Sequence, residues 1–197
     1  FGAALFERDR QEFEVFCYMT STQRDAITEK FENNADAWRP CWGLTDVDLD
    51  AQVRADKIDI LVDLAGHSAG NRLPVFARKP VPIQITAWGH CTGTGMKAMD
   101  YILADWVIMP PEDAKYCAEN VVELSCGLSF VPPEGAPDVL AAPSSTRDHV
   151  TFGCFNRIEK IVDETLHVWS EVLQRVPNAR LVLENAALYS PEAVSQL

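Results

Sequence analysis

The sequence lacks any apolar segment long enough to suggest a membrane protein. None of its hydrophobic runs approaches the roughly 20 residues that a membrane-spanning helix needs. Positive charge is also scarce, since 17 Lys and Arg stand against 29 Asp and Glu and give a net charge of −12. Nucleic-acid-binding proteins carry a basic surface. We therefore expect neither a membrane nor a nucleic acid as a partner.

Ordered cysteine spacing is missing as well. The six cysteines include no Cys-x-x-Cys pair, and no Asp-x-Asp-like pair lies near a predicted strand end. Scattered thiols are typical of reduced cysteines in a cytoplasmic protein, and nothing in this pattern predicts a metal site. A signal peptide pattern and an initiator methionine are absent too. We expect a cytoplasmic location and an internal piece of a longer protein.

Two apolar segments have the composition of buried parallel strands. They cover residues 58–64 and 81–87, and each ends in a polar loop that contains glycine and a histidine. Ligands of open α/β sheets bind beyond the carboxyl ends of such strands. The pattern therefore places His67 and His90 where chemistry is expected.

Helical and extended patterns alternate along the rest of the chain. We expect further strands over residues 13–19, 121–124, 150–155 and 179–183. We expect helices over residues 1–7, 23–33, 47–55, 71–78 and 112–118, a longer one with Asp163 as its N-cap, and one that begins at Pro191. Prolines and small polar residues gather in residues 132–148, which indicates a linker.

Several motifs, in this order, resemble the catalytic region of the O-GlcNAc transferase family, which includes the SPINDLY-type protein O-fucosyltransferases. The first group is Asp63-Leu-x-Gly66-His67-Ser68, Pro80-x-Pro82-Ile-Gln84, Gly89-His90-x-x-Gly93-Thr94-Gly95 and Asp100-Tyr101. The second group is Val150-Thr-Phe-Gly-x-Phe155-Asn156-x-x-x-Lys160-Ile161, Trp169 and Val176-Pro177-Asn178. Together they span most of the chain.

This resemblance implies an α/β fold with two Rossmann-like lobes, the GT-B type of glycosyltransferase, with the sugar donor held largely on the second lobe. Residues 1–131 are then the N-terminal catalytic lobe without its first strand. Residues 132–148 are a proline-rich linker, and residues 149–197 are the start of a truncated, donor-binding C-terminal lobe. Helical repeats are expected to precede this region in the full-length chain.

The resemblance also implies an inverting protein O-glycosyltransferase that acts on Ser or Thr of a protein acceptor without a metal ion or other cofactor. The first expectation is GlcNAc from the nucleotide sugar UDP-GlcNAc. Fucose from GDP-fucose is an alternative, and so is a non-catalytic protein-binding module derived from the enzyme. Because the family's upstream histidine motif and most of the donor site are absent, we expect the 197 residues alone to be inactive.

Lys160 is the leading candidate for donor binding. Inverting transfer releases a nucleoside diphosphate, whose growing negative charge is stabilised by cations and backbone N–H groups. By resemblance, Lys160 matches the family's diphosphate-binding lysine; the alternative is a solvated surface lysine. Nearby, Asn156 either bonds the donor or caps the turn. Arg157 either contacts the diphosphate or forms an ion pair with Glu159.

His67 and His90 are the catalytic candidates besides Lys160. A histidine of near-neutral pKa can orient an acceptor, bond a phosphate or move a proton. The alternative for each is a polar residue that ties its loop to backbone carbonyls. Thr92 and Thr94 are expected either to line the same cleft and bind the donor or to stabilise the turn.

Aromatic side chains give a last group of candidates. Trp38, Trp42 and Trp88 have rings that can stack on a sugar or a peptide. Packing in the core is the alternative for aromatic residues in apolar surroundings.

Overall fold

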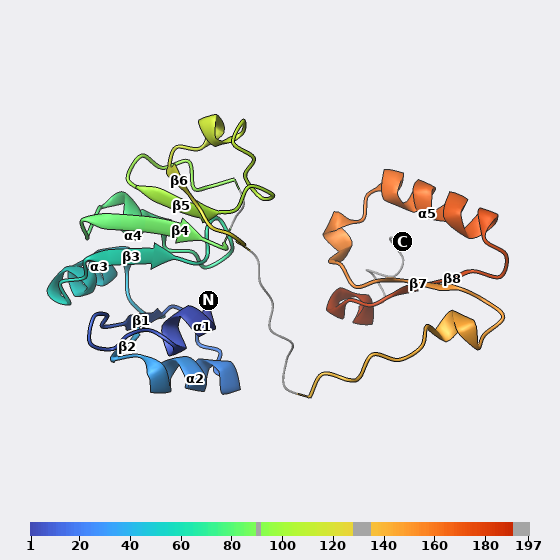
Figure 1. Ribbon diagram of the computed structural model, residues 1–197, viewed down its shortest axis with the longest axis horizontal. Coiled ribbons are helices and arrows are strands. Elements are labelled where there is room, and N and C mark those ends of the chain that lie inside the picture. The colour runs from blue at the N-terminus through green and yellow to red at the C-terminus, as the bar shows by residue number, and fades with distance from the viewer. Residues whose placement is uncertain (90–91, 128–134, 191–197) are drawn as a thin grey trace. The chain divides into compact units, whose positions relative to one another are not determined.

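The computed structural model describes residues 1–89, 92–127 and 135–190, and Figure 1 shows its helices and strands. The chain divides into two compact units, a first unit of residues 1–131 and a second unit of residues 132–197. Every strand pair in the described residues is parallel. The predicted α/β class is therefore confirmed. Within the described residues, no helix combines the length and apolar character needed to cross a membrane.

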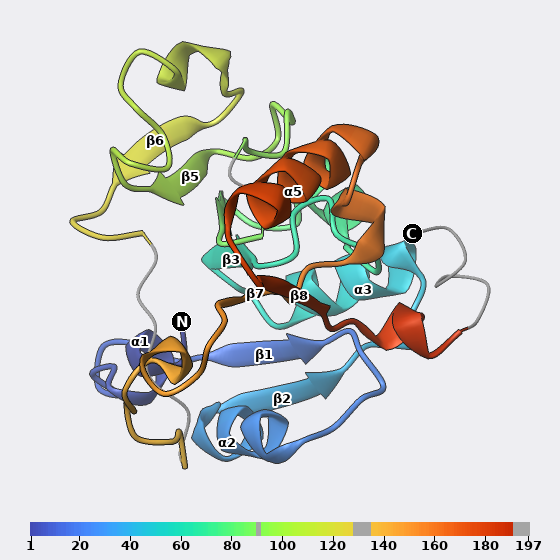
Figure 2. The same ribbon diagram turned by 90° about the vertical axis from the view of Figure 1, so that its right-hand side faces the viewer.

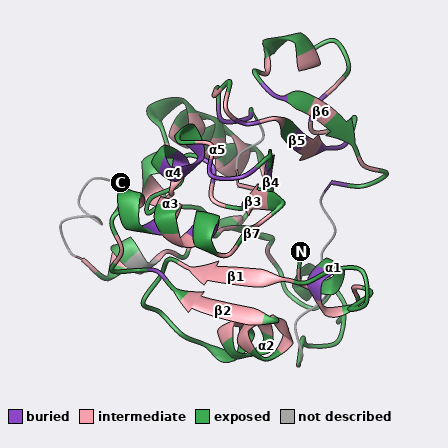
Figure 3. Ribbon diagram, turned by 90° about the vertical axis from the view of Figure 1, so that its left-hand side faces the viewer, coloured by how far each residue is buried: buried purple, intermediate pink, exposed green. Residues whose placement is uncertain are grey.

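The first unit begins with two β-strands, each preceded by a helix. These elements are α1 (Gly2–Phe6), β1 (Phe16–Met19), α2 (Ala26–Asn34) and β2 (Ala37–Pro40). The two strands form a parallel pair and are mostly half-buried (Figure 3). Helix α2 begins where it does because Asp25 and Thr28 form a reciprocal capping box.

A second, four-stranded sheet completes the first unit. Its elements are α3 (Asp46–Ala55), β3 (Ile60–Asp63), α4 (Leu73–Ala77), β4 (Ile83–Ala87), β5 (Tyr101–Ala104) and β6 (Asn120–Glu123). The strand order is β3-β4-β5-β6, with all neighbours parallel. The helix predicted over residues 112–118 is wrong in type and length: only a single 3-10 turn, Ala114–Tyr116, forms there. Cys117, the next residue, has an extended backbone (φ −81°, ψ 144°), so the turn does not continue as a helix.

The core of the first unit lies where α3 and α4 pack together. Five buried side chains form its main cluster: Cys41, Leu49, Val53, Val75 and Val81. The buried amide of Gln84 adds a polar tie, since its Nε2 donates to Phe76 O at 2.9 Å and to Ala98 O at 2.8 Å. The end of α4 and the segment before β5 are thereby fixed to β4.

The second unit contains one β-α-β arrangement (Figure 2). Strands β7 (Thr151–Cys154) and β8 (Arg180–Leu183) pair in parallel and are connected through α5 (Asp163–Arg175). Three 3-10 turns accompany them within residues 135–190: Pro143–Ser145, Ile158–Lys160 and Ala186–Tyr189. The helix predicted from Pro191 lies outside the described residues.

The start of α5 corrects one prediction. Asp163 is the first residue of the helix, not its N-cap; Val162 holds that position and provides no side-chain cap. The apolar side chain of Val162 has no acceptor for a backbone N–H. The carboxylate of Asp163 instead lies in the first turn, where a negative charge stabilises the helix dipole.

Strand β3 also departs from the expectation of a fully buried strand. Asp63 at its end is buried, whereas Ile60 at its start is 48% exposed. One edge of β3 pairs with β4, and its other edge borders a cavity inside the first unit. Ile60 lines this cavity, and its side chain is therefore not covered by the core.

Asp56, at the end of α3, joins that helix to the first sheet. Its carboxylate accepts hydrogen bonds from Arg39 Nη2 at 2.8 Å, Tyr18 Oη at 2.9 Å and Gln52 Nε2 at 3.2 Å. The Arg39 guanidinium holds the pKa of Asp56 below its usual value. Burial and the bond to Asp56 raise the pKa of Tyr18.

We predict that Asp56→Ala lowers the free energy of unfolding by about 1–3 kcal/mol at pH 7, because Arg39 and Tyr18 lose their shared acceptor. The pKa of Asp56 is lower in the folded chain than in the unfolded chain. The contribution of Asp56 to stability is therefore complete above about pH 4, the pKa of the unfolded chain, and is lost as the pH falls through the folded pKa.

Urea unfolding of the wild type and of Asp56→Ala, at pH 7 and at lower pH, measures the difference in unfolding free energy. The control, Asp59→Ala, changes an exposed carboxylate of the same unit. An equal difference at both pH values would contradict this assignment.

Candidate functional site

The carboxyl end of β3 is organised by Asp63. This buried carboxylate accepts the backbone N–H of Ala65 at 3.1 Å, that of Gly66 at 3.0 Å and the Thr86 hydroxyl at 2.8 Å. Gly66 has a φ of 53°, in the left-handed region that favours glycine. Asp63 thus turns the loop that carries His67 and ties it to β4.

The loop after β4 packs directly on the loop after β3. A Cβ atom at Gly89 would lie 2.4 Å from Gly66 N and 2.5 Å from Ala65 C. Only a residue without a side chain permits this backbone contact. Trp88, just before it, has a φ of 58°, which costs a non-glycine residue about 1–3 kcal/mol. The two loops therefore form one closely packed edge.

His67 and Thr94 connect the same two loops. His67 is exposed, and its Nε2 lies 3.0 Å from Thr94 O. This contact is the loop-tying arrangement that we considered as the alternative to catalysis, and it leaves part of the ring accessible. Thr92 is exposed as well. His90, the other catalytic candidate, lies outside the described residues.

Thr94 itself is hydrogen-bonded to Glu119, a residue that the sequence analysis did not identify. Glu119 is 4% exposed, and its carboxylate accepts the Thr94 N–H at 2.6 Å and the Thr94 hydroxyl. The hydroxyl of Thr94 is therefore directed into the protein, as expected for a residue that stabilises the turn. An acidic residue two positions before a predicted strand was the only sequence signal for Glu119.

The loops after β5 and β6 are tied to this edge by Asp105 and Trp88. Asp105 accepts the N–H of Gly127 at 2.6 Å, of Ile108 at 2.8 Å and of Val107 at 3.0 Å, and these bonds lower the pKa of its carboxyl group. Trp88 Nε1 donates to Gly127 O. Hydrogen bonds thus join the strand ends of the sheet.

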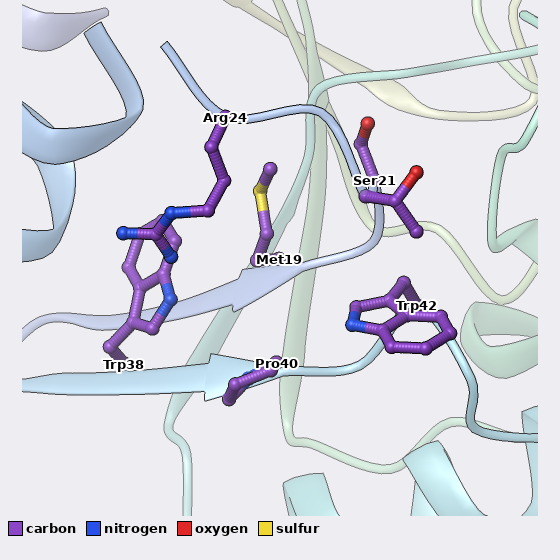
Figure 4. A pocket seen from close by; sticks show the side chains of 7 residues that line it. Met19, Ser21, Arg24, Trp38, Pro40 and Trp42 are labelled. Carbon is purple, nitrogen blue, oxygen red and sulfur yellow. The ribbon is translucent and has the colours of Figure 1, made fainter. Parts of the chain in front are cut away.

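A small pocket of about 160 Å³ lies beyond the carboxyl ends of β1 and β2 (Figure 4). Trp38 and Trp42 line it together with Arg24. Trp42 is 59% exposed and Trp88 43% exposed. Core packing therefore does not account for these two rings, which are accessible to a ligand.

The second unit presents the cationic candidates in the turn between β7 and α5. Asn156 Oδ1 accepts the Arg157 N–H at 3.1 Å, and Asn156 O accepts Asn185 Nδ2 at 3.3 Å, so Asn156 stabilises the turn. The side chains of Arg157 and Lys160 are exposed. In the described part of the chain, no ion pair joins Arg157 to Glu159. Both cations are therefore accessible to an anion.

The N-terminus of α5 adds little to this anion site. Asp163 and Glu164 occupy its first turn, and their negative charges oppose a second anion there. Lys160 lies earlier, at the end of the 3-10 turn, where its own N–H is bonded to Arg157 O at 3.0 Å. Attraction of an anion must then come from the side chains of Arg157 and Lys160. Among the described residues, no group of three His, Cys, Asp or Glu side chains is placed to hold a metal ion.

We predict that Gly89→Ala separates the two loops, because its methyl group would overlap the backbone of Ala65 and Gly66. The expected loss is about 1–3 kcal/mol of unfolding free energy, measured by urea denaturation. The control is Gly43→Ala, where a Cβ has no heavy atom within 4 Å. Equal stability of both variants would show that the loops do not depend on this contact.

Comparison with known proteins identifies close relatives. The sequence profile of Glycosyl transferase family 41 matches residues 5–128. The Arabidopsis thaliana protein named "Probable UDP-N-acetylglucosamine--peptide N-acetylglucosaminyltransferase SPINDLY" is 35% identical over 187 residues, which cover 92% of this chain and 20% of that protein. Its counterpart named SEC, from the same plant, is 28% identical over 192 residues with the same coverage. The chain thus spans about a fifth of the length of these relatives.

A solved structure also shows similarity to a glycosyltransferase. A mutant of Thermobaculum terrenum O-GlcNAc transferase matches 99% of this chain and 37% of its own, with a TM-score of 0.89 and 38% sequence identity. This match confirms the predicted fold class, that of the GT-B glycosyltransferases. The family profile covers well over half of the residues, so the chain belongs to Glycosyl transferase family 41.

Proposed function

We propose that the protein containing these residues is an inverting protein O-glycosyltransferase of the cytoplasm, which transfers GlcNAc from UDP-GlcNAc to Ser or Thr of protein acceptors. Family membership supports glycosyl transfer, and the names of the SPINDLY and SEC relatives support this donor and a peptide acceptor. The observation that carries the proposal is the exposed Lys160 in the turn between β7 and α5, within a motif that resembles one of the family.

Lys160 is the proposed diphosphate ligand. Among the described residues, none forms an ion pair with its ammonium group, so no internal contact has to break before a phosphate binds. Arg157 and Asn156 of the same turn are proposed to complete the donor site, the guanidinium through paired hydrogen bonds to phosphate oxygens. The developing charge of the leaving group would be met by these groups without a metal ion or other cofactor.

The edge formed by the loops after β3 and β4 is the proposed catalytic contribution of the first unit. His67 Nε2 donates to Thr94 O, since a carbonyl oxygen can only accept a hydrogen bond. We propose His67 and His90 as catalytic residues. Thr92 is proposed to contact the donor. Thr94 is proposed to position His67 through its backbone carbonyl group.

GDP-fucose is the second candidate donor. The chain is more similar to the Arabidopsis SPINDLY protein, at 35% identity, than to SEC, at 28%. The resemblance of the block from Val150 to Gly153 points to the same branch, which includes O-fucosyltransferases.

Helical repeats are proposed to precede this region in the full-length chain, where they would bind protein acceptors.

Donor binding by the longer polypeptide tests this function. UDP, UDP-GlcNAc, GDP and GDP-fucose are titrated by calorimetry into the wild type and into Lys160→Ala. We expect one nucleotide pair to bind, and Lys160→Ala to weaken that binding at least about tenfold, or roughly 1.4 kcal/mol. Arg175→Ala, which removes an exposed cation of α5, is the matched control and should bind as the wild type does.

The base of the nucleotide that binds identifies the donor. Binding that Lys160→Ala leaves unchanged would contradict the role of Lys160. Absence of binding by any of the four nucleotides would favour the non-catalytic protein-binding module.

A further inference from the structure

Glu119 is a buried acid whose hydrogen bonds, in the part of the chain that the structure describes, all go to one loop residue. Its side-chain oxygen Oε1 accepts both the N–H of Thr94, at 2.6 Å, and the Thr94 hydroxyl. The other oxygen, Oε2, is buried and has no hydrogen-bond partner among the described residues. Burial of a charged group costs free energy. A carboxylate with this single partner therefore indicates a role at Thr94 rather than a general contribution to stability.

The backbone beside Glu119 is anchored to the sheet. The next residue, Asn120, begins β6, and its N–H donates to Asp100 O at 2.9 Å, just before β5. From this point β5 and β6 pair in parallel. The carboxylate of Glu119 therefore extends from the start of a paired strand, which is the kind of rigid element that can hold another group in place.

Gly93 leaves the space that this carboxylate occupies. The φ of Gly93 is 74°, in the left-handed region. A Cβ atom at Gly93 would lie 2.6 Å from Glu119 Oε2 and 3.2 Å from Glu119 Cδ. Any side chain at this position would therefore displace the carboxylate from Thr94. The loop glycine and the buried acid fit together as one contact.

Thr94 connects Glu119 to His67. The Thr94 hydroxyl donates to Glu119 and also accepts the Met96 N–H at 3.3 Å, so the loop is fixed on both sides of Thr94. The carbonyl oxygen of Thr94 accepts a hydrogen bond from His67 Nε2 at 3.0 Å. A continuous series of hydrogen bonds thus runs from the start of β6, through one loop residue, to the histidine after β3.

We propose that Glu119 is a positioning residue for His67 and acts through Thr94. The inference rests on the proposed function, in which His67 is a catalytic residue of glycosyl transfer. A misplacement of about 1 Å in an active site can lower the rate about 100-fold. Glu119 fixes the carbonyl group of Thr94, and this carbonyl group fixes the His67 ring. Without the carboxylate, Thr94 loses two hydrogen bonds and the ring loses its fixed acceptor.

A purely structural role of Glu119 leads to a different expectation. If Glu119 only stabilised the first unit, its removal would lower the transfer rate by the same factor whether or not His67 is present. A positioning residue instead loses its effect once the group that it positions has been removed, because residues that act as a unit are not additive. The two roles are therefore separable by kinetics.

Transfer kinetics of the longer polypeptide test the proposal, with UDP-GlcNAc or GDP-fucose as the donor and a synthetic peptide library with a central Ser or Thr as the acceptor. We expect Glu119→Ala to lower kcat at least about tenfold and to change the KM of the donor by less than about threefold, since the donor is proposed to bind the second unit. In the His67→Ala background, Glu119→Ala should change kcat by less than about twofold. An equal loss in both backgrounds would overturn the proposal.

Substitutions of Thr94 test the same link if Glu119→Ala folds poorly. Thr94→Val removes the hydroxyl that bonds Glu119 but keeps the carbonyl group that accepts from His67. Thr94→Ser keeps the hydroxyl and should retain more of kcat than Thr94→Val does. The control is Glu123→Ala, which removes an exposed carboxylate of β6 and should transfer as the wild type does. Equal kcat values of Thr94→Val and Thr94→Ser would contradict a role of Glu119 through Thr94.

The same measurements separate this inference from the proposed function. If His67→Ala lowers kcat and Glu119→Ala does not, the inference alone is overturned. If His67→Ala leaves kcat unchanged, the catalytic role of His67 is wrong, and the positioning role of Glu119 with it. Absence of transfer by the wild type with either donor would overturn both.

Discussion

The buried carboxylate of Asp63 is the interaction on which the candidate site of the first unit depends. It fixes the loop after β3 through two backbone N–H groups and joins that loop to β4 through Thr86. The backbone contact of Gly89 with Gly66 requires this arrangement. His67 can then reach the carbonyl of Thr94. A substitution of Asp63 at the end of β3 is therefore expected to alter the loops after both β3 and β4.

The two units contribute different chemistry to the proposed reaction. In the first unit, buried acidic groups such as Glu119 hold loops by accepting backbone N–H groups. In the second unit, Arg157 and Lys160 are exposed and have no internal partner to compete with a phosphate among the described residues. Because these 197 residues carry a net charge of −12, a local cationic site of this kind favours the binding of an anionic donor.

Much of the fold and part of the site could be predicted from local patterns. Apolar runs and glycine-containing loops correctly predicted β3 and β4, and the motif around Lys160 correctly predicted a strand followed by a turn and a helix. Glu119 was missed because its partner, Thr94, is distant in the sequence and neither residue is unusual alone. The N-cap of α5 was wrongly assigned by one residue. Asp163 is a better N-cap residue by type than Val162, but the backbone becomes helical at Asp163, which makes Val162 the N-cap.

The sequence by itself determined the order and type of most elements, the family and the residues available for catalysis, because periodicity, turn residues and motifs are local properties. Only the tertiary structure decided which of these residues meet. It directed the Thr94 hydroxyl inward, left Lys160 exposed and opened a cavity beside Ile60. Such outcomes depend on the pairing of distant strands and on close packing between loops, which no short stretch of sequence encodes.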